Sequence, residues 1–273
     1  MADEKGKKGQ TLNLGGRRYY SLSSYDPVSI TVQIGCAIEE DVDAAMEDMA
    51  RDFGIDVSDI DDAWVAKNFG DLVSVAELRD EMFYHTQDFF AEDAEDQKPR
   101  LVAHALAERL EQGPSEEDIE LIFDDMLAKF EHNLSMTGQT LDGFAKSFGG
   151  SRDMVEAMFW ENARDVAAED AALDAYARER KLRVCEDEFV MLLDLNPEEM
   201  PGMVANAKEA GAYDELVDAA LRAKALNVAV AECTCEYEHE TPEEAKERFE
   251  ASYGRDFPGA GSGAGAASGF KLV

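Results

Sequence analysis

The fold is decided by one stretch of the chain, Ser115-Glu-Glu-Asp-Ile-Glu-Leu-Ile-Phe-Asp-Asp-Met-Leu-Ala-Lys-Phe-Glu-His-Asn-Leu134. Most of its apolar residues recur every three or four positions, with acids between them, and this spacing predicts an amphipathic helix. Ser115 stands at the expected N-cap, where a hydroxyl oxygen can accept a hydrogen bond from a helix N–H, and acids follow it. The stretch therefore predicts a helix that begins after Ser115 and buries one face.

Two more segments of this kind follow directly. Thr140 precedes one short apolar stripe, and Ser151 precedes another that continues to Tyr176. The stripes are rich in Phe and Met, which suits either helix-on-helix packing or a soft surface for unfolded or extended partners. Both interpretations stay open for the candidate contact residues, which are Phe123, Met126, Phe130, Phe144, Phe148, Met154, Met158 and Phe159.

The charge balance excludes several classes of partner. Against 26 Lys and Arg the chain has 60 Asp and Glu, a formal net charge of −34, which repels nucleic-acid phosphates and anionic bilayers. Residues 1–18 are a local exception, and we expect this Gly-containing stretch to be a solvated tail, with contact to an anion as the alternative. Its basic residues are Lys5, Lys7, Lys8, Arg17 and Arg18.

The sequence also bears on the compartment. There is no run of about 18 apolar residues and no apolar signal core near residue 1, a pattern that favours a cytoplasmic protein. The four cysteines are too scattered for a disulfide framework, so reduced thiols are expected.

The remaining pattern predicts a mainly α fold: an elongated helical domain with arm-like helical hairpins, plus a small strand–helix element. The strand is Ile30–Ile34, which would pair either with Tyr19–Leu22 or with the edge of another chain's sheet. Glu39–Phe53 is the helix that follows it. A long helix begins at Ser74, and Pro99 is expected to interrupt or restart it.

No catalytic, metal or cofactor motif is found. The glycine pairs lack the residues of a phosphate-binding loop, and the four histidines lack zinc-ligand spacing. Cys233 and Cys235 with His239 come nearest to a metal site, but thiols at the end of an apolar helix are expected to pack as small hydrophobes. Acid pairs are too common in this chain to indicate acid–base catalysis. We therefore predict no catalytic residue, no metal and no cofactor.

The order of the segments resembles the C-terminal chaperone domain of the trigger factor family. The stretch from Asp59 to Arg79 is similar to the family's Asp-rich turn, its aromatic-x-x-Lys helix, a Gly and a Ser-x-x-Glu-Leu-Arg helix. Residues 101–148 resemble the first arm, with Met126-Leu-x-x-Phe130 and Gly138-Gln-Thr-Leu-Asp-Gly-Phe144 at the matching places. Residues 151–176 resemble the long return helix. Lys224 stands at the Lys of the closing helix, and the resemblance covers about residues 59–238.

Two parts of that family have no counterpart in this sequence. The Gly-Phe-Arg-x-x-Lys ribosome-docking signature does not occur, and no room remains for a prolyl isomerase domain between Gly54 and Asp59, although Ile30–Phe53 resembles the opening strand and helix of the N-terminal domain. The expected organisation is a basic tail, a strand–helix element, a helical chaperone domain, and an acidic helix followed by a Gly/Ala/Ser tail, at 1–22, 23–56, 57–238 and 239–273.

The resemblance implies an ATP-independent, holdase-like chaperone of bacterial type that acts in protein folding or transport and binds unfolded or nascent polypeptides on its arms. A second copy of the chain is a further possible partner, and ribosome binding is in doubt without the docking signature. Two alternatives stay open: an interaction or assembly module for one native protein, and a divergent peptidyl-prolyl isomerase.

Overall fold

Helices form most of the structure, a computed structural model that describes residues 19–147 and 149–253. Contacts divide the chain into two units that are each discontinuous in sequence. The arm unit contains residues 19–30 and 98–235 of the described chain, and the strand–helix unit contains 31–97 and 236–253. The predicted mainly α fold with a small strand–helix element is confirmed. The predicted domain at 57–238 differs from this grouping, because 57–97 packs with the strand–helix unit.

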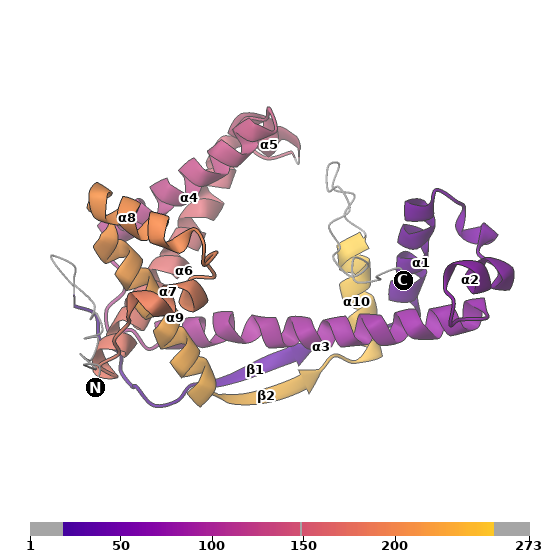
Figure 1. Cartoon of the computed structure of the whole chain (residues 1–273), viewed down its shortest axis with the longest axis horizontal. Helices are drawn as coiled ribbons and strands as arrows, with labels where there is room; N and C mark the ends of the chain where they lie inside the picture. Colours follow the sequence, from indigo (N-terminus) through magenta and orange to yellow (C-terminus); the bar gives the residue numbers. More distant parts are fainter. Residues whose placement is uncertain (1–18, 148, 254–273) are drawn as a thin grey trace, which may run out of the picture. The chain divides into compact units, whose positions relative to one another are not determined.

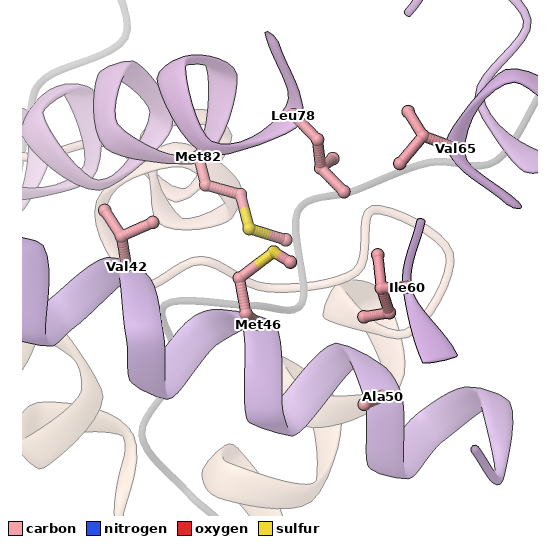
Figure 2. Close-up of a cluster of buried hydrophobic side chains, with 7 residues drawn as sticks. All are labelled: Val42, Met46, Ala50, Ile60, Val65, Leu78 and Met82. Atoms are coloured by element: carbon pink, nitrogen blue, oxygen red, sulfur yellow. The ribbon is translucent and has the colours of Figure 1, made fainter. Parts of the chain in front are cut away.

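The strand–helix unit is built around the first helix after the strand. Strand β1 (Ser29–Ile34) leads into α1 (Glu39–Phe53), the turn η1 (Val57–Asp59), α2 (Asp62–Asn68) and the first part of α3 (Val75–Ala107). Its core joins α1, α2 and α3 (Figure 2), where the side chains of Met46 and Met82 point toward one another. The buried members of this core are Val42, Met46, Ala50, Ile60, Val65, Leu78 and Met82.

The strand pairs with a segment that the sequence did not mark as a strand. β1 lies parallel to β2 (Thr234–His239), with Thr234 N–H donating to the Val28 carbonyl at 2.8 Å and Glu240 N–H to that of Ile34 at 2.9 Å. The predicted pairing of Ile30–Ile34 with Tyr19–Leu22 is therefore wrong, and Leu22 instead bridges to Leu110. The alternative, addition of the strand to another chain's sheet, stays a prediction. Cys235 lies in this strand rather than in a helix.

The last helix, α10 (Pro242–Tyr253), is docked on the strand–helix unit. Arg248 donates to Asp41 Oδ2, to the Cys36 carbonyl and to Glu240, each at 3.2 Å. Its guanidinium also lies 4.6 Å from the ring centre of Phe90. These contacts hold α10 against α1 and the residues before it, and against α3.

The prediction that Pro99 breaks the long helix is wrong. Helix α3 runs unbroken from Val75 to Ala107 with Pro99 inside it. Proline removes a single N–H donor, and the buried side chains of Ala94, Val102 and Leu106 hold the helix on both sides of that position.

The arm unit contains the helices between residues 116 and 232 (Figure 1). The hairpin is formed by α4 (Glu116–Met136), α5 (Leu141–Ser147) and α6 (Arg152–Glu179), with α4 and α6 side by side. Beyond it come η2 (Glu186–Glu188), α7 (Phe189–Leu192), α8 (Met200–Ala210) and α9 (Tyr213–Glu232), which packs along α6. Phe189 and Leu221 are fully buried in the core that joins α7, α8 and α9.

Candidate polypeptide-binding arm

The hairpin begins and turns where the sequence places hydroxyl side chains. Ser115 Oγ accepts from Asp118 N–H at 3.2 Å, and Ser151 Oγ accepts from Met154 N–H at 3.3 Å, so both long helices have the predicted N-caps. Thr140 Oγ1 accepts from Gly143 N–H at 3.1 Å at the start of α5. Arg152 of α6 donates to Glu131 of α4 at 3.0 Å and ties the two helices together near the turn.

Aromatic rings hold the inside of the hairpin together. The ring centre of Phe130 lies 5.0 Å from that of Phe144 and 5.0 Å from that of Phe159, so α4, α5 and α6 meet at one point. Farther along the hairpin, Phe123 contacts Trp160 edge to face at 5.3 Å. Such ring pairs add to the free energy gained by burying their area. These side chains are half-buried and pack against the buried aliphatic side chains of the hairpin, such as Leu134 and Val155.

The candidate contact residues therefore separate into three groups: half-buried residues, one residue outside the described ranges, and two exposed methionines. Phe123, Met126, Phe130, Phe144 and Phe159 are half-buried between the helices of the hairpin. Phe148 lies outside the described residues.

Met154 and Met158 are exposed on α6, at 51% and 62%. They are four residues apart and so lie on the same face of the helix, one turn from each other. Burial thus divides the candidate residues into an inner part, aromatic apart from Met126, and an outer part formed by Met154 and Met158.

Two exposed apolar residues of α4 were missed by the sequence reasoning. Leu121 is 67% exposed and Met136 is 76% exposed. Leu121 stands off the apolar stripe, and that irregularity is the one signal in the sequence that marks it. Met136 lies at the end of α4, so its position gave no signal of exposure.

A groove with acidic walls lies between α4, α6 and α9. Its volume is about 190 Å³, and we call it the acidic groove. Leu121 and Ile122 line it together with Tyr20, Asp118, Asp170, Asp174 and Arg222. Arg222 Nε donates to Asp174 at 2.7 Å, and its NH1 donates to Asp170 at 2.7 Å. Burial alone would lower the pKa of the Arg222 guanidinium, but its bonds and charge contacts with these carboxylates raise it, so this residue stays charged.

A second hollow lies on α8 of the arm unit. It has a volume of about 420 Å³, and its lining residues are Glu186, Met200, Pro201, Val204, Ala205 and Lys208. Lys208 Nζ donates to Glu186 at 2.7 Å, and the two side chains form a salt bridge there. The exposed apolar surface of the arm unit is therefore not confined to the hairpin.

No group of three or more His, Cys, Asp or Glu side chains in 19–147 and 149–253 is arranged to hold a metal ion. Cys233 stands at the end of α9, and burial beside Cys235 raises the pKa of its thiol, which disfavours the reactive thiolate. Within the same ranges, no helix is long and apolar enough to cross a membrane.

No protein-family model, curated protein or solved structure matches this chain. The resemblance to trigger factor thus rests on the order of segments in the sequence, and it stays a hypothesis.

Proposed function

We propose that this protein is an ATP-independent, holdase-like chaperone related to trigger factor, which binds non-native polypeptides on the outer surface of the α4–α6 hairpin. The observation that carries the proposal is the exposure of Met154 and Met158 on a helix whose aromatic side chains face inward. Leu121 and Met136 add exposed apolar area on α4. An unbranched, polarizable methionine adapts to partners of different shape, as a chaperone surface requires.

The packing of the hairpin supports a division of roles in this proposal. The half-buried rings of Phe130, Phe144 and Phe159 fix the spacing of the helices, so they act on client binding indirectly. The exposed methionines make the contact. Acidic residues beside them on both helices keep the protein soluble when no client is bound, because their charged side chains are hydrated.

Suppression of aggregation tests the proposal. A client enzyme is heated to its unfolding temperature while light scattering is recorded, with no nucleotide present. Below the protein's own unfolding temperature, a several-fold molar excess should reduce the scattering in proportion to the amount added. Scattering that is unchanged while circular dichroism shows the protein still folded would contradict the proposal.

A second candidate function is an assembly module for one native partner. The observation that favours it is the two-stranded sheet: in the described part of the chain it contains β1 and β2 alone, so a strand from a partner could extend it. A complex of fixed stoichiometry with one folded protein, and no effect on unrelated clients, would favour this function. Clients of varied sequence bound without a fixed ratio would favour the chaperone.

A further inference from the structure

The described chain enters the arm unit on the wall of the acidic groove. Tyr20 is 8% exposed, and its hydroxyl donates to Asp118 Oδ2 at 2.6 Å. The guanidinium of Arg178 donates to the Tyr20 carbonyl, which fixes the backbone as well as the ring. Because Tyr20 and Asp118 both line the groove, the residues before Tyr20 start from its edge.

Covalent geometry then places two cations near that groove. Consecutive Cα atoms are about 3.8 Å apart. The Cα atom of Arg18 is therefore at most about 8 Å from that of Tyr20, and the Cα atom of Arg17 at most about 11 Å, for any path of the chain. Residues 1–18 carry five Lys and Arg against Asp3 and Glu4. They also contain two leucines, Leu12 and Leu14.

The surface that faces this entry has the opposite charge. The groove is lined by three carboxylates, those of Asp118, Asp170 and Asp174, and by the single guanidinium of Arg222. Helix α4 carries seven acidic residues and one basic residue, and α6 carries eight and three. One of those three, Arg178, lies 4.9 Å from the ring centre of Tyr19 at the entry. The net charge of both helices still favours a basic segment.

We propose that residues 1–18 dock in the acidic groove of their own chain, with arginines against the carboxylates and a leucine against the apolar wall of Leu121 and Ile122. Tethering makes this docking effective although each contact is weak. A short linker gives an effective concentration on the order of millimolar, so a contact with a dissociation constant of about 0.1 mM would be roughly nine-tenths occupied. Because the contact is largely electrostatic and partly exposed, salt should release it.

Docking has a consequence that rests on the proposed function. Leu121 belongs both to the groove and to the exposed apolar surface of the hairpin. A docked segment would therefore cover part of the client surface, and clients would compete with it. The docking itself does not depend on that function, and it is tested without any client.

Trypsin tests the docking in the full chain. The bond after Lys8 lies more than ten residues from Tyr20, so local structure at the entry does not shield it. We expect release of residues 1–8 to be at least about fivefold slower than from a synthetic peptide of residues 1–22 in low salt. In about 0.3 M NaCl the two rates should converge, since the Debye length falls below about 6 Å.

Three variants locate the contact. R17Q/R18Q keeps the Lys8 site but removes two cations, and it should be cut at the peptide's rate. L121S should also speed cleavage, while V73S, a matched change at a 65%-exposed residue of the other unit, should not. The proposal is overturned by cleavage of the native chain at the peptide's rate in low salt, or by protection that R17Q/R18Q and L121S leave unchanged. Protection that grows with protein concentration would also overturn it, because the groove would then hold the segment of a second copy.

Discussion

The ring centres of Phe130 and Phe159 lie 5.0 Å apart, with an angle of 43° between the ring planes. This contact joins α4 to α6 near the turn of the hairpin. Phe130→Ala removes this contact and the one with Phe144. We expect a loss of about 2 to 3 kcal/mol in the stability of the hairpin, less than for a fully buried phenylalanine. Amide hydrogen exchange of α4 and α6 measures it. Leu121→Ala, at an exposed position of the same helix, should change the free energy of opening measured by exchange by less than about 0.5 kcal/mol.

Gly35 owes its identity to a close approach rather than to a turn. A Cβ added there would lie 2.8 Å from Cγ of Phe90. The guanidinium of Arg248 also lies over this ring. Gly35→Ala should therefore destabilise the strand–helix unit by about 1 to 3 kcal/mol through overpacking. Gly70→Ala is the control, since a Cβ at Gly70 meets nothing within 4 Å. Equal unfolding midpoints for the two variants in urea would refute the steric account.

Glu188 and Lys224 form an ion pair that links η2 to α9 in the arm unit. Lys224 Nζ donates to Glu188 Oε1 at 2.6 Å, and Cys185 N–H donates to Oε2 at 2.8 Å. The bond from Lys224, followed by that from Cys185, lowers the pKa of the Glu188 carboxyl. A lowered carboxyl pKa stabilises the fold above the unfolded value of about 4.3, and this stability is lost as pH falls through the folded value.

Glu188→Gln should therefore cost about 1 kcal/mol at pH 7, because the pair is partly exposed. The difference from the native chain should shrink below about pH 4, where the carboxyl is protonated in the unfolded state. Urea unfolding at pH 7 and pH 3.5 measures both values. Glu209→Gln, at an exposed position of α8, is the control, and a gap that stays constant with pH would show that the charge of Glu188 does not matter.

Arg248 fastens α10 to the strand–helix unit through Asp41, Glu240 and the Cys36 carbonyl. Arg248→Gln leaves those carboxylates without their cation, and we expect α10 to exchange its amide hydrogens at least about tenfold faster. Lys246→Gln is the matched control on the same helix, because Lys246 is exposed and lies 3.5 Å from Glu40. Faster exchange in the control alone would contradict this account.

The helices were predictable because their signals are local. Capping hydroxyls at Ser115 and Ser151 and a three-to-four spacing of apolar residues are enough to place α4 and α6. The partner of β1 could not be found in this way. It lies some 200 residues away, and β2 has no apolar face: of its six residues only Cys235 is even half-buried.

The candidate site was predictable in composition but not in orientation. The spacing that puts Phe159 on the same stripe as Met154 and Met158 does not say which of them meets a second helix. Pro99 is a case where a clear local signal was misleading. A proline inside a helix predicts a break, but the buried side chains on both sides of Pro99 keep α3 continuous. Burial is decided by contacts between helices, and a single-sequence pattern does not contain them.

The most direct test of the chaperone proposal replaces the exposed methionines and leaves the aromatic core intact. M154S/M158S should keep the unfolding temperature of the native chain within a few degrees, because both side chains are exposed. It should lose most of its ability to suppress aggregation of a heated client at equal molar ratio. V73S/Y84S, which changes two exposed apolar residues of the strand–helix unit, should suppress as well as the native chain. Full suppression by M154S/M158S, with V73S/Y84S equal to it, would contradict the assignment of client binding to the hairpin.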